Sequence, residues 1–581
     1  MVVLRRAVNA VPLPVREQAH RVLPRRVWRA LRAVGREQTG LQRTARRARI
    51  AAAQLPGPQG WRQPTTRIDL EGRAVVALTT EQFRSSAALA EHLSMVADAL
   101  EAGGVDYFVL VAEPERRRVV VVPASERKAA VAALTKGLRG SPTYVARVRG
   151  TALDAPRLIG RSGMPRGNVL RLFHVYASTS GGFLGGPTLG CDVEFWQEAA
   201  GSPAGDNGEA VPAGALLAPR RNPWVDIVRP DQRTARRVVD GHERTVLSTL
   251  NLPHLFTVTQ PIDVVYTWVD GSDPDWILRK AAAQDEHLTR ATVMHALAAN
   301  DSRFASRDEL RYSLRSLDMY ADWVNHVYLV TDDQVPPWLD TSHPRLTVVS
   351  HKELFGDRGV LPTFNSHAIE TQLHHIEGLS EQYLYLNDDV FFGRPVSPSL
   401  FFHSNGLARF QTSHAKIGLG SSEAEDMPVM SAAKNNRDLI AHQFGRTIAN
   451  KFKHVPHALR RSVMTDLEQE FAEDFKRTAA SQFRNHADVS VSASLGHYYG
   501  YITGRAVPGS LRYFYADIAR EDTPSRLEEL LRRRNFDVFC LNDHDSSSMS
   551  LAMQTKLIEG FLGQYFPQPS SFERPDSMTN R

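Results

Sequence analysis

The fold is decided by one stretch, Ile262-Asp263-Val264-Val265-Tyr266-Thr267-Trp268-Val269-Asp270-Gly271-Ser272-Asp273-Pro274, in which an apolar run meets an acidic turn. The apolar part is rich in β-branched residues, which predicts a buried strand, and the Asp-Gly-Ser-Asp-Pro segment predicts that the strand ends in a polar loop. Ligands of open α/β sheets bind at the carboxyl ends of the strands. We therefore expect Asp270 and Asp273 to contact a substrate.

Other predicted strands of the second half of the chain end in the same way. Residues 383–386 lead into Asn387, Asp388 and Asp389, and residues 536–541 lead into Asn542 and Asp543. Further strands are expected over 326–331 and 346–349, and helices over 309–317 and 366–376, with long amphipathic helical segments over about 456–478 and 489–503. This alternation predicts an α/β domain with a mainly parallel sheet and helical additions.

Paired carboxylates at several strand ends are typical of a metal and phosphate site. Mg²⁺ takes oxygen ligands in a near-octahedral array, which Asp388, Asp389 and Asp543 could supply. Each pair alone is equally well explained as a turn, a helix cap or surface charge, but three pairs at three strand ends favour a site. His454 and His457 could suggest zinc, yet no Cys or further His follows at ligand spacing, so zinc is not expected.

Several other side chains are candidates for binding and proton transfer. Arg311 and Arg315 share a helix face and could clamp a phosphate, or form a salt bridge to a neighbouring helix. His486, close to Arg484 and Asp488, is a candidate general base, although most single histidines are structural or exposed. By its position alone, Glu370 is an ordinary residue of a helix surface.

Composition and charge divide the 581-residue chain into regions. Residues 1–50 hold thirteen Arg, no Lys and two Glu, a net +11, so the remainder carries 6 − 11 = −5. This basic tail, with its linker to residue 66, could be solvated, lie on an anionic membrane, or bind nucleic acid, which is the least expected. Residues 67–250 predict a small α+β accessory domain, 258–568 the catalytic domain, and 569–581 a C-terminal tail.

Two features bear on where the protein is found. The only cysteines, Cys191 and Cys540, are far apart in the sequence, which makes a disulfide framework unexpected and a reducing compartment plausible. The sequence contains no run of about 18 apolar residues, so no transmembrane helix is predicted. The expected location is the cytoplasm, either free or at the inner face of the membrane.

Six segments of this sequence together resemble the four conserved regions of the Stealth family. They are residues 263–273, 309–316, 361–364 with 368–370 (Leu-Pro-Thr-Phe and Ala-Ile-Glu), 376–380, 385–390 (Tyr-Leu-Asn-Asp-Asp-Val) and 540–543 (Cys-Leu-Asn-Asp), and the similarity extends to about residue 568. Stealth proteins are sugar-phosphate transferases of bacterial capsule and exopolysaccharide synthesis, related to the catalytic subunit of the animal N-acetylglucosamine-1-phosphotransferase.

The resemblance implies a glycosyltransferase-A-like fold and transfer of a hexose-1-phosphate, with Mg²⁺ or Mn²⁺, from a nucleotide sugar to a hydroxyl of a glycan. Glu370, Asp389, Arg484 and Asp488 fall on family motif positions, and Asn387 and Asn542 are expected to bind substrate. In the animal motif a His follows the Arg directly, where this chain has Asn485, so His486 departs from the pattern. The alternatives are a glycosyltransferase that attacks the anomeric carbon and a non-catalytic binding protein.

Overall fold

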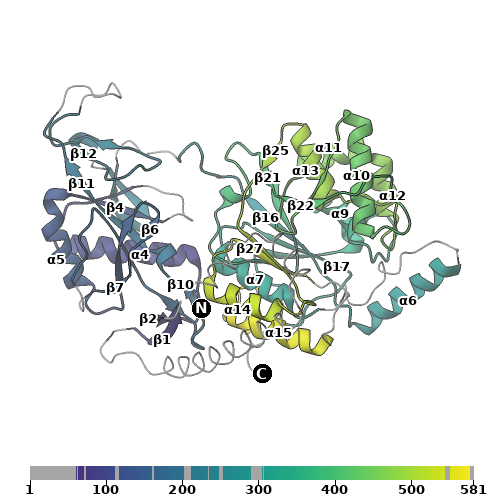
Figure 1. The fold of residues 1–581 in the computed structure, drawn as a ribbon, viewed down its shortest axis with the longest axis horizontal. Coiled ribbons are helices and arrows are strands. Elements are labelled where there is room, and N and C mark those ends of the chain that lie inside the picture. Colours follow the sequence, from purple (N-terminus) through teal and green to yellow (C-terminus); the bar gives the residue numbers. More distant parts are fainter. Residues whose placement is uncertain are drawn as a thin grey trace, which may run out of the picture.

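The computed structural model describes residues 61, 63–70, 73–110, 117–159, 163–201, 211–232, 235–247, 253–289, 304, 306–542 and 550–575. The basic segment 1–50 and Asp543 lie outside the described residues. Figure 1 shows two parts side by side, an N-terminal part in purple and blue and a larger part in teal to yellow.

The N-terminal part is an α+β structure built on two sheets. The smaller sheet has the order β1 (Thr65–Leu70), β2 (Arg73–Thr79), β9 (Tyr176–Ala177) and β10 (Phe183–Gly185). The larger has the order β14 (Ala235–Val239), β15 (His242–Val246), β3 (Phe108–Leu110), β4 (Val119–Pro123), β11 (Cys191–Glu198), β8 (Val169–Phe173), β5 (Tyr144–Arg149) and β6 (Ala152–Leu153), with β7 (Arg157–Leu158), β12 (Leu216–Leu217) and β13 (Ile227–Val228) at its sides. Helices α4 (Ser85–Ala102) and α5 (Arg127–Gly137) pack on it, which confirms the predicted α+β class.

The larger part is centred on a five-stranded sheet. Its order is β18 (Leu346–Ser350), β17 (Val327–Thr331), β16 (Ile262–Thr267), β19 (Gln382–Asn387) and β24 (His457–Arg460). The first four strands are parallel, and β24 is antiparallel to β19. Residues 262–267 thus form the central strand, and the predicted mainly parallel α/β sheet is confirmed.

Helices cover both faces of this sheet because successive residues of β16 point to opposite sides. Val264 and Tyr266 join the core cluster formed with α7 (Glu309–Tyr320) and α15 (Leu551–Tyr565). Val265 joins the cluster on the other face. That face is covered by α8 (His351–Phe355), α9 (Ser366–Glu370), η6 (Leu373–His375), α11 (Arg461–Glu470), α12 (Ala472–Ala479) and α13 (Gly496–Ile502).

The remaining elements of the larger part surround the end of β19. A three-stranded sheet has the order β20 (Val390–Phe392), β27 (Val538–Asn542) and β26 (Tyr513–Asp517). Two-stranded pairs are formed by β21 (Ala408–Phe410) with β25 (Ala506–Pro508) and by β22 (Thr412–Lys416) with β23 (Asn450–Phe452). The other helices are α6 (Pro274–Thr289), α10 (Pro428–Phe444) and α14 (Thr523–Arg533).

Three of the predicted helical segments are interrupted. The segment over 456–478 begins with strand β24, and a break at Phe471 separates α11 from α12. The segment over 489–503 begins with a π-helical turn, Val491–Leu495, before α13. The segment expected over 366–376 divides into α9 and η6. Burial explains β24, because it completes the sheet beside β19 with residues His457 to Leu459 buried.

The two parts share an apolar core and several hydrogen bonds. Leu184 and Leu189 of the N-terminal part belong to the same buried cluster as Tyr320 of α7, and the Tyr320 hydroxyl donates to the Leu184 carbonyl at 3.1 Å. The side chain of Gln568 donates to the Thr80 carbonyl at 2.6 Å. The N-terminal part is therefore docked on α7 and on the segment that contains Gln568. Among the described helices, none is both long and apolar enough to cross a bilayer.

Buried histidines predict that acid destabilises the fold. Burial, reinforced by His174, lowers the pKa of His92 to about 3, and burial lowers the pKa of His497 to about 3. Between pH 6.5 and about 3 the unfolded chain takes up protons that the folded chain does not, so stability falls as the pH falls. The slope reaches about 1.4 kcal/mol per pH unit for each histidine.

Urea unfolding at pH 7, 6 and 5 measures this dependence. We expect the midpoint to drop at each step, and His442→Asn, which alters an exposed histidine of α10, to leave the dependence unchanged. An equal midpoint at pH 7 and pH 5 would contradict the prediction.

Candidate active site

The turn after β19 carries two carboxylates, Asp388 and Asp389, between two strands. β19 ends at Asn387 and β20 begins at Val390, and β20 pairs with β27 so that Val390 lies opposite Cys540. This pairing places two β27 side chains at Asp389: Cys540 Sγ and Asn542 Nδ2 both donate to Asp389 Oδ2 at 3.3 Å. The predicted strand-end residues Asn387, Asp388, Asp389 and Asn542 are thus brought together.

His454 also contacts this turn, although the sequence analysis did not place it there. Its Nε2 lies 3.0 Å from Asp389 Oδ1 and 3.2 Å from Asn387 Nδ2. The register of β24 explains the contact. Tyr385 of β19 lies opposite His457, so in this antiparallel pair the residues before His457 run past the end of β19. Although desolvation opposes it, the carboxylates of Asp389, Glu370 and Asp388 raise the pKa of His454.

The carboxylates at this turn repel one another. Burial, together with the charges of Glu309 and Asp389, raises the pKa of Asp388 well above its usual range. Burial also raises the pKa of Glu309, at the start of α7, and Asp389 adds to that effect. Three acidic side chains in mutual repulsion are the electrostatic setting that a cation relieves.

The donor set at the turn fits a divalent cation. Asp389, His454 and Cys540 present one ligand atom each within 4.8 Å of one another. The carboxylates of Asp388 and Asp389 and the amide oxygen of Asn542 are the hard ligands that Mg²⁺ or Mn²⁺ prefers. Burial, and then Asp389, raise the pKa of the Cys540 thiol, which keeps it protonated and a poor ligand. Asp543, the third predicted ligand, lies outside the described residues.

A second group of polar side chains is buried between α9 and the loop after α12. Asp488 is fully enclosed, and its Oδ2 accepts from Asn365 Nδ2 at 2.8 Å and from the backbone N–H of Asn485 at 2.9 Å. His367 Nδ1 lies 3.7 Å from the same oxygen. Arg484 donates through Nη2 to Ser366 at 2.7 Å.

Three buried atoms of this second group have no hydrogen-bond partner among the described residues. They are Asp488 Oδ1, His367 Nδ1 and Arg484 Nε. Buried polar atoms are normally paired, so orphaned ones mark a place where a ligand or water completes the bonding. The second group is therefore a candidate substrate-binding site.

Glu370 connects the two groups. Its carboxyl is buried, which raises its pKa, while the positive charges of His367, Arg484 and His454 oppose that effect. His454 of the first group and His367 and Arg484 of the second therefore interact electrostatically with the same carboxyl group, that of Glu370. We treat the turn after β19 and the buried group around Asp488 as one site.

His486 is placed differently from the prediction. Its side chain is exposed, and its backbone carbonyl accepts from Asn435 of α10 at 2.7 Å. The carboxylate of Asp488 is turned to His367 and Asn365, and no hydrogen bond to His486 is found among the described residues. The expected pairing of His486 with Asp488 is not observed, and His367 occupies the position that was assigned to His486.

Asp270 and Asp273 are engaged in the loop that follows β16. Asp270 Oδ1 accepts from the N–H and the hydroxyl of Ser272, at 2.9 and 2.6 Å. Asp273 Oδ1 accepts from the N–H of Asp275 at 2.9 Å at the start of α6, and Gln334 donates to Asp273 Oδ2 at 2.8 Å. These bonds account for both residues as turn and capping groups, and their role in substrate binding stays a prediction.

Arg311 and Arg315 do lie on one face of α7, but that face holds a carboxylate. Glu573 accepts from Arg311 Nε at 2.5 Å and from Arg315 Nε at 2.7 Å, and all three side chains are buried. Residues 569–575 of the predicted C-terminal tail thus pack into the fold, with Phe572 fully enclosed. This triad favours the salt-bridge interpretation, and the phosphate-clamp role stays a prediction.

Removing the charge of Glu573 is expected to destabilise the fold strongly. In Glu573→Gln the two guanidinium groups stay buried without their carboxylate, which costs about 3 kcal/mol. Equilibrium denaturation measures the loss. The control is Glu529→Gln, which breaks an exposed pair with Arg533 and should cost less than about 0.5 kcal/mol. Equal stability of the two variants would rule out this role for Glu573.

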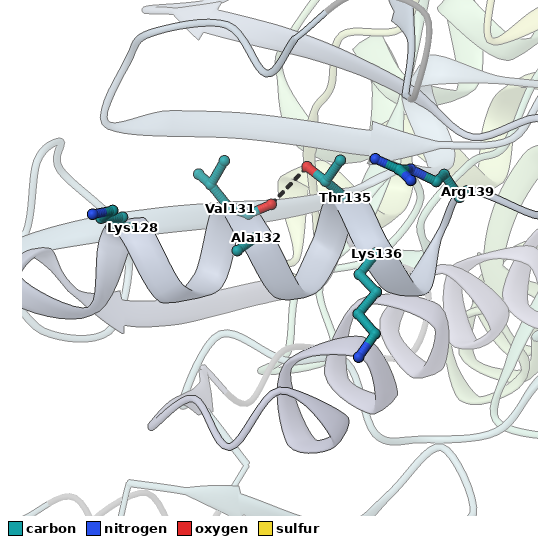
Figure 2. A pocket seen from close by; sticks show the side chains of 6 residues that line it. All are labelled: Lys128, Val131, Ala132, Thr135, Lys136 and Arg139. Carbon is teal, nitrogen blue, oxygen red and sulfur yellow. Dashed lines mark hydrogen bonds between the residues drawn. The ribbon is translucent and has the colours of Figure 1, made fainter.

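A surface depression of about 530 Å³ lies apart from these residues, on α5 of the N-terminal part. Figure 2 shows its lining, in which Lys128, Lys136 and Arg139 extend outward and Thr135 donates to the Val131 carbonyl, at 2.6 Å. It contains no carboxylate, histidine or cysteine, so it offers no group for metal binding or acid–base chemistry at neutral pH.

Four side chains of the candidate site were not predicted from the sequence: His367, His454, Cys540 and Glu309. His367 lies between the stretches 361–364 and 368–370 that carry the resemblance, and its position one turn before Glu370 was the available signal. His454 and Glu309 reach the site through strand pairing and helix packing between distant segments, which leave no local pattern.

Comparisons with known proteins identify the family of this chain. Models of the four Stealth protein conserved regions match residues 260–287, 303–410, 453–501 and 528–581 for regions 1 to 4. An exopolysaccharide phosphotransferase of Streptomyces coelicolor is 43% identical over 504 residues, 84% of this chain and 82% of that protein. Exopolysaccharide phosphotransferase CpsY of Mycobacterium tuberculosis is 34% identical over 80% of this chain and 85% of that protein.

Among solved structures, the galactosyltransferase LgtC in complex with donor and acceptor sugar analogues gives a TM-score of 0.27 at 11% identity, over 53% of this chain and 96% of that chain. The residues that form the candidate site fall mainly within the matched regions: Asp388 and Asp389 in region 2, His454 and Asp488 in region 3, and Cys540 in region 4. On the four matched regions and the extent of the sequence identity, this chain belongs to the Stealth protein family.

Proposed function

We propose that this chain is an exopolysaccharide phosphotransferase that moves a hexose-1-phosphate from a nucleotide sugar to a hydroxyl group of a glycan, with Mg²⁺ or Mn²⁺ as cofactor. The observation that carries the proposal is that two clusters of polar side chains, the turn after β19 and the buried group around Asp488, meet at one site. The acidic turn Asp388–Asp389 suits a pyrophosphate-bound cation, and the buried set of Arg484, His367 and Asp488 suits phosphate binding and proton transfer. The names of the curated relatives support the same reaction.

Each residue has a role in the proposed reaction. Asp388, Asp389 and the amide oxygen of Asn542 would hold the cation, with Asp543 as the further predicted ligand. Bound there, the cation would neutralise charge on the donor pyrophosphate. Arg484 would bind an oxygen of the phosphate that is transferred, since its Nε is buried and unpaired among the described residues.

Proton transfer is assigned to the pair His367 and Asp488. With Nδ1 directed to Asp488, as its 3.7 Å separation indicates, the opposite ring nitrogen would accept the proton of the acceptor hydroxyl. The resulting oxygen attacks the phosphorus attached to the hexose, and the nucleoside monophosphate leaves with the electrons of the broken P–O bond. Glu370, between the two groups, would hold Arg484 and the histidines in place.

The released nucleotide tests the reaction. The protein is incubated with Mg²⁺, a panel of UDP- and GDP-hexoses and a phosphate-free oligosaccharide acceptor, and the nucleotide product is separated by chromatography. We expect nucleoside monophosphate. Release of nucleoside diphosphate would show attack on the anomeric carbon and overturn the proposal in favour of glycosyl transfer. No turnover of any donor would favour the alternative that the chain is a non-catalytic binding protein.

Membrane contact through residues 1–50 is a separate proposal, tested by salt-sensitive liposome binding that is lost in a chain lacking those residues.

A further inference from the structure

A second cluster of metal-ligating side chains lies outside the candidate active site, where η6 meets α11. His374 Nε2 is 2.7 Å from Glu468 Oε2, and His375 Nε2 is 2.9 Å from the same oxygen. The three ligand atoms lie within 4.8 Å of one another. Two imidazoles and a carboxylate that converge on one point form a ligand set found in zinc sites.

Core packing fixes the backbone on both sides of this cluster. Leu373 and Leu467, each adjacent in sequence to a ligand, are fully buried in the same apolar cluster. The side chain of His374 is 1% exposed, whereas those of His375 and Glu468 are 27% and 25% exposed. The cluster is therefore held from the inside by the core and is bordered on the outside by two partly exposed side chains. An incoming ion would enter from the side of His375 and Glu468.

Hydrogen bonding explains only part of the arrangement. His374 Nε2 forms a hydrogen bond with Glu468 Oε2, but His375 Nε2 is a buried atom with no hydrogen-bond partner among the described residues, despite its short distance to that oxygen. A ring nitrogen this close to a carboxylate oxygen, without hydrogen-bond geometry, is unusual for a simple ion pair. A cation placed between the two atoms would satisfy both.

We propose that His374, His375 and Glu468 form a zinc site with a fourth, water-filled position. Zinc bonds of about 2.0–2.1 Å in a tetrahedral array set ligand atoms roughly 3.3 Å apart, so the observed separations need to open by about half an ångström. Two nitrogen ligands favour Zn²⁺ over Mg²⁺. Since η6 follows α9 by two residues, the ion would fasten the segment that carries Glu370 to α11. Its role would be structural and independent of the reaction at the strand ends.

The test uses the full chain with Asp389→Asn, which removes a ligand from the group at the strand ends. After treatment with a chelator, the protein is titrated with ZnCl₂, passed over a desalting column and analysed for bound metal. We expect about one zinc per chain. In the same background, His375→Ala and Glu468→Gln should each weaken zinc binding at least about 100-fold. The matched control His442→Ala, at an exposed histidine, should bind as the parent does.

Cobalt and thermal unfolding supply two further readouts. Co²⁺ should give the visible bands of tetrahedral ligation without a thiolate charge-transfer band, since no cysteine belongs to the cluster. Zinc should raise the melting temperature of the control by at least about 2 °C and leave that of Glu468→Gln unchanged. No bound zinc, full retention of zinc in both cluster variants, or a thiolate band abolished by Cys540→Ser would each overturn the proposal.

Discussion

The Asp389→Asn variant is expected to lose at least about 10³-fold in the rate of nucleotide release, which corresponds to about 4 kcal/mol of transition-state stabilisation. Asp389 is the residue of the turn that the neighbouring side chains contact: it accepts hydrogen bonds from Cys540 and Asn542, and it lies 3.0 Å from His454. The amide keeps the size of the side chain but removes its charge. The variant should therefore fold, bind the cation weakly and fail to stabilise charge on the donor.

Three measurements separate this effect from damage to the fold. The rate is followed as nucleoside monophosphate release, cation affinity by titration with Mn²⁺, and stability by thermal unfolding. The control is Asp333→Asn at the end of β17 in the same sheet, where the carboxylate pairs with exposed Lys352 at 2.8 Å. Asp333 has a φ of 56°, a conformation that Asn tolerates. A rate for Asp389→Asn within tenfold of the parent, at normal stability, would exclude a catalytic role for the turn.

The central part of the fold could be predicted because its signals are local. The strands β16, β17 and β19 are apolar runs of five or six residues that end in polar turns, and the structure reproduces them with nearly the same ends. A strand end also specifies where its last side chains emerge. Because β19 and β27 were both predicted as strands that end in polar residues, the meeting of Asp388 and Asp389 with Asn542 could be predicted.

The rest of the site depends on contacts between distant segments. The Glu573 carboxylate meets Arg315 across 258 residues, and no periodicity in either segment indicates that partner. His454 reaches Asp389 only because β24 is antiparallel to β19, and residues 456–478 read as a continuous amphipathic helix in the sequence. The helical pattern does not decide the structure there, because the four residues of β24 are buried by pairing with the edge of the sheet at β19.

The identity of the general base illustrates the same limit for a single residue. Arg484, His486 and Asp488 are neighbours in sequence, which suggested that His486 and Asp488 act together. The loop instead turns the Asp488 carboxylate inward, where Asn365 and the N–H of Asn485 hold it, and leaves the His486 side chain outside. Sequence proximity in a loop does not determine which side chains face each other.

His367→Ala is expected to lower kcat about 10²- to 10⁴-fold with a small change in KM, the range for loss of a general base. His486→Ala should stay within about threefold of the parent, because its side chain is exposed and no bond joins it to Asp488 among the described residues. The two histidines are matched in chemistry and differ in placement. Their comparison therefore decides which one removes the acceptor proton.

Asp488→Asn probes the same step through orientation of the imidazole. The amide can still meet His367, but it no longer favours a protonated ring, so kcat should fall about 10²-fold. The pH profile is the readout that a purely structural role would not move. The pH profile of kcat for His367→Ala should therefore differ from that of the parent. A large loss in His486→Ala with an unchanged profile in His367→Ala would instead make His486 the base, acting from a loop that closes over the acceptor.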